Sequence, residues 1–369
     1  MQRLFTASLL LLFGVSLQAQ SNPFHTLNMP VASKPVTETQ KVGVTYITID
    51  YHSPVLQGRD VWNDVRVIPQ NGDPYPWRAG ANMNTTIAFS TDVLINGEPL
   101  PAGKYGFHMI PKGDNQFTLL FAHANHQWGS YYLDVERDVT LQVPVTGREC
   151  PLSENLDYEF EHRQEGQVDI ALHWGTKSIP FTVSVNLNET VVNSLRQELL
   201  GVNTYHWQAW NDAARWCYEH DTNLEEALEW VNHSINGGYG GFAADKNAGN
   251  LMTKILIADK LGREAVYDET IREMVELDID PGEANSVSQY LLRIGKLDEA
   301  IELLTNTLAE NEEAWFLYLN RATAYYGQKN QQKMKADLAK ARETVPDNYR
   351  QMLESFEKRL LDGSYKLGS

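Results

Sequence analysis

The chain has 369 residues, of which 42% are hydrophobic and 21% charged, and its 48 acidic against 31 basic side chains give a net charge of −17. This globular composition excludes a collagen, a disulfide scaffold and a wholly disordered chain, and the length favours two domains. So negative a chain repels phosphate backbones and anionic lipid headgroups, so we expect no nucleic-acid partner.

The first twenty residues have the order of segments found in a secretory signal peptide. Arg3 supplies a positive start, residues 9–15 are a short apolar run, and residues 16–20 are small and polar, as a cleavage site requires. The apolar run is too short for a membrane anchor, which needs about 20 residues. We therefore expect an exported protein, periplasmic or extracellular, with no transmembrane segment after signal removal and with residues 21–34 as a flexible lead-in.

Residues 35–188 alternate short runs of β-branched and aromatic side chains with Gly, Pro and Asn. No long helical period interrupts these runs, so they predict antiparallel strands in an all-β sandwich or barrel. Asn96-Gly97 predicts a tight hairpin turn with positive φ at both residues. The predicted strands are residues 41–51, 84–95, 104–110, 116–123, 138–145, 167–174 and 179–187.

After a linker predicted at residues 189–203, residues 204–369 follow a 3.6-residue period. Gly262 and Gly295 are 33 residues apart, close to the 34-residue period of tetratricopeptide repeats. This half is therefore predicted to be an all-α array of tetratricopeptide-like repeats, which we expect to bind a protein partner. The predicted helices are residues 223–235, 260–277, 294–308 and 327–346. Small, aromatic and Pro positions of the repeat motif are matched by Ala322, Tyr325, Ala341 and Pro346.

Two features of these halves leave alternatives open. One cysteine lies in each predicted domain, Cys150 in the first and Cys217 in the second. A disulfide between them would link the two domains covalently, and otherwise they are two thiols that pack as small hydrophobic side chains. The tryptophans of the helical half either line a ligand groove or belong to the core. These tryptophans are Trp207, Trp210, Trp216, Trp230 and Trp315.

Several blocks of the β-rich half occur in a characteristic order. They are WRAGAN (77–82), AGKYGFHMIP (102–111), WGS (128–130) and LHW (172–174). In this order and spacing, residues 35–187 resemble the domain-of-unknown-function family numbered 2911, found in exported proteins of Bacteroidetes-type bacteria. The resemblance implies a fold and a compartment but no activity. Met83 stands where the family commonly has Glu, so any chemistry that needs this carboxylate would be missing here.

The strongest candidates for ligand binding are Arg59, Trp77, Arg78, Asn82 and His108. The guanidinium of Arg78 suits a carboxylate, and the ring of Trp77 could stack on a sugar, so we expect a small anionic or carbohydrate ligand. In the alternative interpretation, both arginines are held by Asp60, Asp64 or backbone carbonyls and organise the 52–83 loop, while Trp77 fills the core.

His123 and His126 have the spacing of two metal ligands, but a zinc site would need a third, such as His52 or His108. Without an HExxH motif or a nearby Cys pair, we interpret them as loop histidines, weak candidates only, and we expect no metal or cofactor. Ser130 follows Gly129 without the surrounding G-x-S-x-G turn of a nucleophilic serine.

Two functions from different classes fit these observations. The favoured one is an exported, non-catalytic binding or scaffold protein. In it, the β-domain holds a ligand or partner and the helical repeats contact a protein. The alternative is a hydrolase of an envelope component, a glycan or a peptide, with a pocket around Arg78 and His108 and a carboxylate that the sequence does not identify.

Overall fold

The structure, a computed structural model, describes residues 30–238 and 242–367 and divides the chain into two units, Met1–Asn186 and Leu187–Ser369. The signal peptide expected at residues 1–20 and most of the lead-in lie outside the described residues. Within the described part, no helix is both long and apolar enough to cross a membrane.

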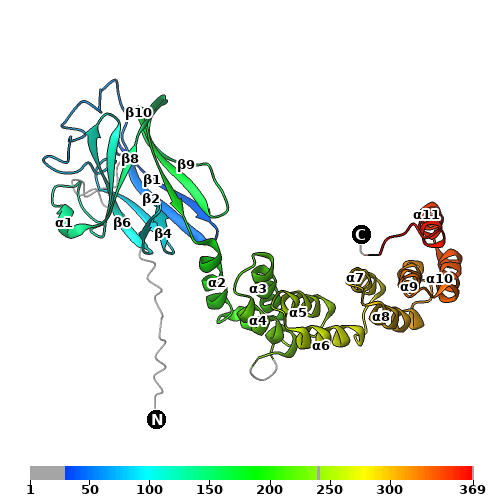
Figure 1. Cartoon of the computed structure of the whole chain (residues 1–369). Helices are drawn as coiled ribbons and strands as arrows, with labels where there is room; N and C mark the ends of the chain where they lie inside the picture. Colours follow the sequence, from blue (N-terminus) through cyan, green and yellow to red (C-terminus); the bar gives the residue numbers. More distant parts are fainter. Residues whose placement is uncertain (1–29, 239–241, 368–369) are drawn as a thin grey trace, which may run out of the picture. The chain divides into compact units, whose positions relative to one another are not determined.

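The first unit is a sandwich of two antiparallel sheets around one buried apolar core (Figure 1). One sheet has the order β1-β2-β3-β6-β7-β8 and the other β5-β4-β10-β9. The strands are β1 (Lys34–Val42), β2 (Thr45–Ser53), β3 (Thr85–Phe89), β4 (Val93–Ile95), β5 (Glu98–Leu100), β6 (Gly103–Gly113), β7 (Gln116–Ala122), β8 (Val139–Thr146), β9 (Arg148–Glu161) and β10 (Gln167–Ser184), with the short helix α1 (Val135–Asp138) before β8. The predicted all-β antiparallel fold is confirmed, as a sandwich.

Several strand boundaries differ from the prediction. The run at 41–51 is a hairpin, because Gly43 with φ of 55° turns the chain between β1 and β2. The run at 84–95 divides into β3 and β4, which belong to different sheets. Both runs predicted within 167–187 lie in β10, which folds back on itself near Gly175 (φ of 64°), because Oγ1 of Thr182 donates to Oδ1 of Asp169 at 2.6 Å. The predicted turn is confirmed, with φ of 49° at Asn96 and 91° at Gly97.

The long connection between β2 and β3 packs as part of the core. Ile68 and Trp77 are buried, and the ring of Trp77 stacks on that of Trp174 with centroids 5.9 Å apart and planes at 10°. Trp62 meets Trp77 edge-on at 5.6 Å and donates a hydrogen bond from Nε1 to the carbonyl of Trp174. Burial of these large side chains fixes the loop onto the sandwich.

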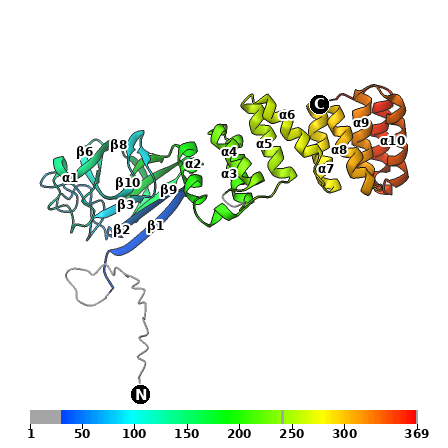
Figure 2. The same ribbon diagram turned by 90° about the horizontal axis from the view of Figure 1, so that it is seen from below.

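The second unit consists of helices in which α3 and α4, α5 and α6, α7 and α8, and α9 and α10 pack as neighbours (Figure 2). Gly262 and Gly295, both at positive φ, separate the members of two pairs, and Ala322, Tyr325 and Ala341 are buried between helices as the repeat motif predicts. The helices are α2 (Leu187–Glu198), η1 (Val202–Tyr205), α3 (Trp207–Glu219), α4 (Leu224–Asn236), α5 (Ala248–Lys260), α6 (Glu264–Val275), α7 (Pro281–Arg293), α8 (Leu297–Glu310), α9 (Trp315–Gly327), α10 (Gln331–Thr344), η3 (Asp347–Tyr349) and α11 (Arg350–Leu361).

The linker predicted at residues 189–203 is largely helical instead. Helix α2 occupies most of it, and Val192 and Leu199 pack into the apolar core of the helical unit. Its apolar side chains recur at helical spacing, which is the pattern that gives a helix a buried stripe. The helical unit therefore begins at Leu187 and not at residue 204.

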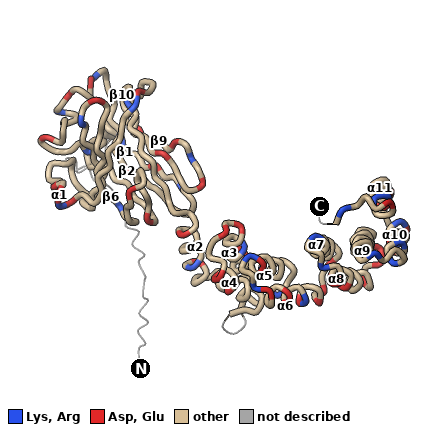
Figure 3. The backbone as a smooth tube through the Cα atoms, in the orientation of Figure 1, with Lys and Arg blue, Asp and Glu red and all other residues tan. Residues whose placement is uncertain are grey.

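Acidic and basic positions are interspersed along both units (Figure 3). In the helical unit many of them pair between helices, as Arg196 does with Glu226 and Lys296 with Asp268. Such partly exposed pairs contribute little each to stability.

Candidate functional site

Two of the residues predicted from the sequence, Arg78 and His108, share one face of the six-stranded sheet. In the loop that precedes β3, the backbone of Trp77 pairs with that of Met109 in β6 through two hydrogen bonds of 2.8 Å. Trp77 and Met109 both point into the core. Because side chains alternate along extended chains, the next residue of the loop, Arg78, and the preceding residue of β6, His108, lie on the opposite face.

Residues 123–134 cover this outer face. His108 and Leu120 are fully buried there although they point away from the core between the sheets. Gly106 is required at the same place, because a Cβ on it would lie 2.4 Å from the carbonyl oxygen of Ala124 and 2.9 Å from Nδ2 of Asn84. The AGKYGFHMIP block thus places a glycine and a histidine, two residues apart, under one covering loop.

Buried polar groups collect beneath this loop. The backbones of Asn84 and Gln127 are joined by the hydrogen bond from Asn84 N to Gln127 O, and Gln127 N donates to Asn84 Oδ1 at 2.8 Å. Oγ1 of Thr86, Nε2 of His108 and Oε1 of Gln127 have no hydrogen-bond partner among the described residues. Unpaired buried polar atoms are costly, and proteins concentrate such costs at functional sites.

His108 is paired with the hydroxyl of Ser130. Nδ1 lies 2.7 Å from Oγ of Ser130, and either atom can be the donor, depending on the imidazole tautomer. Burial, with the nearby charge of Arg78 as a second cause, lowers the pKa of His108 to about 4. The imidazole is therefore neutral at physiological pH.

Arg78 lies at the edge of the same patch and is half-buried. Its guanidinium donates from Nη1 to the carbonyl of Asn82 at 2.5 Å and from Nη2 to the hydroxyl of Tyr131 at 3.1 Å, and it lies 5.4 Å from the centre of the Tyr131 ring. Tyr75 packs edge-on against Tyr131 at 4.8 Å. We call Tyr75, Arg78, Asn82 and Tyr131 the Arg78 site.

The structure brings Arg78, Asn82 and His108 into one neighbourhood but places the other two candidates elsewhere. Trp77 is only 3% exposed in the tryptophan cluster of the core, so its ring offers no face to a ligand. Arg59 is exposed and donates to the carbonyls of Val55 and Leu56, so it stabilises its own turn at the start of the loop.

Met83, the position at which the chain departs from the family pattern, pairs with Trp128 through an isolated backbone bridge. It is half-buried and brings no carboxylate to the Arg78 site. Within the residues that the structure describes, no carboxylate lies within salt-bridge distance of Arg78. The guanidinium of Arg78 is thus contacted, within the described residues, by neutral hydrogen-bond acceptors and an aromatic ring and by no opposite charge.

The weak metal candidates are exposed. His123 has Nε2 3.8 Å from Asp138, and His126 is exposed in the same loop. Neither belongs to a group of three close donor atoms in the described ranges, where one such group occurs, made by Glu159, Glu161 and His173. Sequence reasoning missed that group because the strand that carries the two acids, β9, was not among the predicted strands.

The geometry gives little support to a hydrolytic site around His108. A serine nucleophile needs its hydroxyl open to substrate and a histidine oriented by a third group. Ser130 is 1% exposed, and Nε2 of His108 has no partner within the described part of the chain. The pair instead anchors the covering loop to β6.

Tyr75 and Tyr131 belong to the site, and the sequence reasoning did not single them out. Tyr131 directly follows the WGS block, which was the available signal. It is 48% exposed, so the Arg78 site combines a half-buried cation with an accessible aromatic ring. That combination suits an anionic ligand with an apolar or sugar face.

The tryptophans of the helical unit mostly pack inside it. Trp230 is buried, Trp210 stacks on His233 at 3.8 Å and Trp216 stacks on His220 at 4.0 Å. Both cysteines are free thiols, with Cys150 half-buried in β9 and Cys217 buried in α3.

Comparison with known proteins shows that residues 33–183 match a family described as "Protein of unknown function (DUF2911)". The comparison with curated proteins returned no match. Among solved structures, the chain is similar to one described as "YrrB: a TPR protein with an unusual peptide-binding site", with 18% identity, a TM-score of 0.32, and coverage of 47% of this chain and 84% of that chain.

Proposed function

Since residues 33–183 match a family whose function is unknown, we propose from the geometry that this chain is a non-catalytic binding protein whose β-unit holds a small anionic or carbohydrate ligand at the Arg78 site. The observation that carries the proposal is the half-buried guanidinium of Arg78, which has neutral partners and no carboxylate in the described residues. A buried or half-buried charge is stabilised by an opposite charge, and here a ligand would supply it.

The neighbouring groups support a ligand that carries both an acid and a ring. Tyr131 presents an accessible aromatic face beside the cation, and the side-chain amide of Asn82 makes no hydrogen bond to the described residues, so it is available for a hydroxyl. Arg78 is held in place by Asn82 and Tyr131, which lowers the entropy lost when a carboxylate binds. A carboxylated sugar combines these features.

Replacing Arg78 with alanine is expected to weaken binding of a glucuronate-containing disaccharide by about tenfold or more, because a charge-assisted bidentate contact is lost. The free energy of unfolding should change by only about 1 kcal/mol, since the partners left behind are a carbonyl and a phenol that water can reach. Isothermal titration calorimetry and thermal unfolding measure the two effects.

Arg59→Ala is the matched control, because it also removes an arginine of the same loop but lies in a different turn. It should bind the disaccharide as the parent does. Equal binding of a neutral disaccharide by the parent would argue against a role for charge. A large loss of stability in Arg78→Ala would show that the arginine serves the fold.

We further propose that the helical unit contacts a protein partner and that the chain is exported. Paired helices stacked as repeats present extended surfaces, which supports the first proposal. The order of charged, apolar and small residues in 1–20 supports the second. Mass spectrometry of the protein from its native cell should find the N-terminus near residue 21, and a mature species that keeps Met1 would contradict export by this signal.

A further inference from the structure

We propose that Glu159, Glu161 and His173, on the outer face of the four-stranded sheet, form a binding site for a divalent transition metal, with Zn²⁺ as the representative ion. One donor atom from each residue lies within 4.8 Å of the other two. The site is distinct from the Arg78 site, which lies on the six-stranded sheet, and does not depend on the function proposed for it.

The pleat of the sheet places these three side chains together. Glu159 and Glu161 are two residues apart in β9, so both point away from the core, in which the intervening strand positions of β9 are packed. His173 is in the adjacent strand β10, where its neighbours Leu172 and Trp174 are buried in the same core. The two glutamates, at alternate positions of β9, and the histidine from β10 therefore converge on one point above the sheet.

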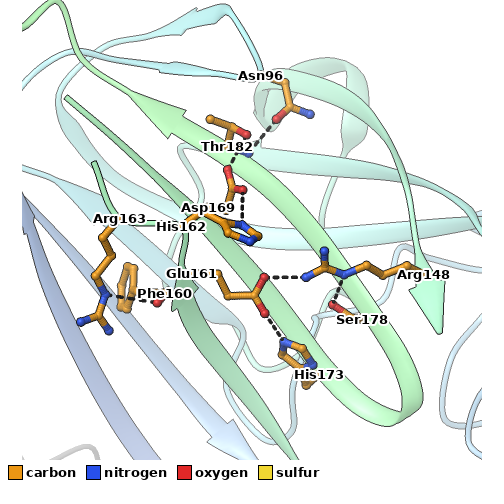
Figure 4. A network of polar contacts seen from close by, with 10 residues as sticks. All are labelled: Asn96, Arg148, Phe160, Glu161, His162, Arg163, Asp169, His173, Ser178 and Thr182. Atoms are coloured by element: carbon orange, nitrogen blue, oxygen red, sulfur yellow. Dashed lines mark hydrogen bonds and ion pairs between the residues drawn. The ribbon is translucent and has the colours of Figure 1, made fainter. Parts of the chain in front are cut away.

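The spacing of the donors is close to that of a metal centre. Nε2 of His173 lies 3.2 Å from Oε1 of Glu161 and 3.9 Å from Oε2 of Glu159 (Figure 4 shows His173 and Glu161). Ligands about 2.1 Å from a tetrahedral ion are separated from one another by about 3.4 Å. Small rotations of the exposed Glu159 side chain would complete this arrangement and leave the fourth position open to water.

The chemistry of the donors selects among metals. An imidazole nitrogen suits Zn²⁺, Cu²⁺, Ni²⁺ and Fe²⁺, whereas Mg²⁺ and Ca²⁺ prefer oxygen donors alone. The three proposed ligands differ in how far their side chains are exposed to solvent. The side chain of His173 is 13% exposed and that of Glu161 is 21% exposed, whereas that of Glu159 is 62% exposed. Two ligands are thus held by the sheet and the third can move to admit an ion from solvent.

A partner outside the three ligands orients one of them. Arg148 donates to Oε2 of Glu161 at 2.5 Å, which leaves Oε1 directed at His173 (Figure 4). Hydrogen bonds of this kind hold ligating carboxylates in place in metal sites. In the absence of an ion the same atoms form a His–Glu contact, and a divalent ion would replace it while Arg148 keeps its bond.

The test titrates the tag-free full-length protein, freed of metal by a chelator, with Zn²⁺ in a calorimeter. We expect one site per chain, with affinity at least about tenfold weaker in Glu159→Gln and in His173→Gln. Glu149→Gln is the matched control, because Glu149 is an exposed acid of the same strand outside the site. It should bind Zn²⁺ like the parent, and Mg²⁺ should bind much more weakly than Zn²⁺ to the parent.

Glu159→Gln decides the result if His173→Gln fails to fold, because an exposed glutamate contributes little to stability. Absence of Zn²⁺ binding by the parent overturns the proposal. Zn²⁺ binding that Glu159→Gln leaves unchanged would also overturn it. An affinity for Mg²⁺ equal to that for Zn²⁺ would overturn it as well, because such binding is typical of an acidic surface without a defined site.

Discussion

Replacement of Trp77 by alanine is expected to lower the free energy of unfolding of the β-unit by about 4 kcal/mol, the largest effect that we predict for one side chain. The indole is 3% exposed, stacks on Trp174 and meets Trp62 edge-on. Its removal leaves a cavity that the surrounding rings can fill only in part. Chemical denaturation followed by tryptophan fluorescence and far-UV circular dichroism measures the loss.

Tyr132→Ala is the control for this experiment, because Tyr132 is an aromatic residue of the same unit that is 83% exposed. The free energy of unfolding of Tyr132→Ala should stay within about 0.5 kcal/mol of that of the parent. If Trp77→Ala costs less than about 1 kcal/mol, Trp77 is not part of the core and the ligand-stacking interpretation regains support.

Acidification is expected to destabilise the β-unit through His108. The pKa of this residue is about 4 in the folded protein, against an ordinary value of 6.5 for the unfolded chain. Between these values the unfolded state binds a proton that the native state does not. The contribution of His108 is therefore complete above pH 6.5 and falls by about 3 kcal/mol as the pH drops to 4.

The comparison of parent and His108→Gln unfolding at several pH values isolates this contribution. The variant should be less stable at pH 7, because the bond to Ser130 is altered, but its stability should fall less between pH 6.5 and 4. His126→Gln, which changes an exposed histidine of the covering loop, is the control and should unfold like the parent at pH 7. Equal slopes in parent and His108→Gln would contradict the burial of an unprotonated imidazole.

The change from strands to helices was readable from the sequence because it depends on local periodicity. A period of two in the first half and of 3.6 in the second follows from which side chains face a core, whatever the partner element is. The Asn96-Gly97 turn and the glycines at 262 and 295 were likewise predictable, since positive φ is a property of the residue and its neighbours.

Elements with a weak apolar pattern were not predictable in this way. Strand β9 has polar or charged residues at many positions and only a few inward side chains, such as Leu156 and Tyr158. Helix α2 carries a stripe of four apolar residues within a polar segment, which resembles a linker in composition. In both cases the partner that buries the few apolar side chains decides the structure. For β9 this is mainly the following strand β10 and for α2 the following helix α3, and the local pattern does not say that either will pack there.

The Arg78 site shows the same division between local pattern and tertiary partner. The blocks containing Arg78 and His108 stood out in the sequence, but no local pattern says that Trp77 pairs with Met109, and this pairing alone puts Arg78 and His108 on one face under Ser130. The residue types and their spacing in the sequence indicated which side chains could bind a ligand. Register between distant strands decided which of them meet, because a shift of one residue turns every side chain of a strand to the opposite face.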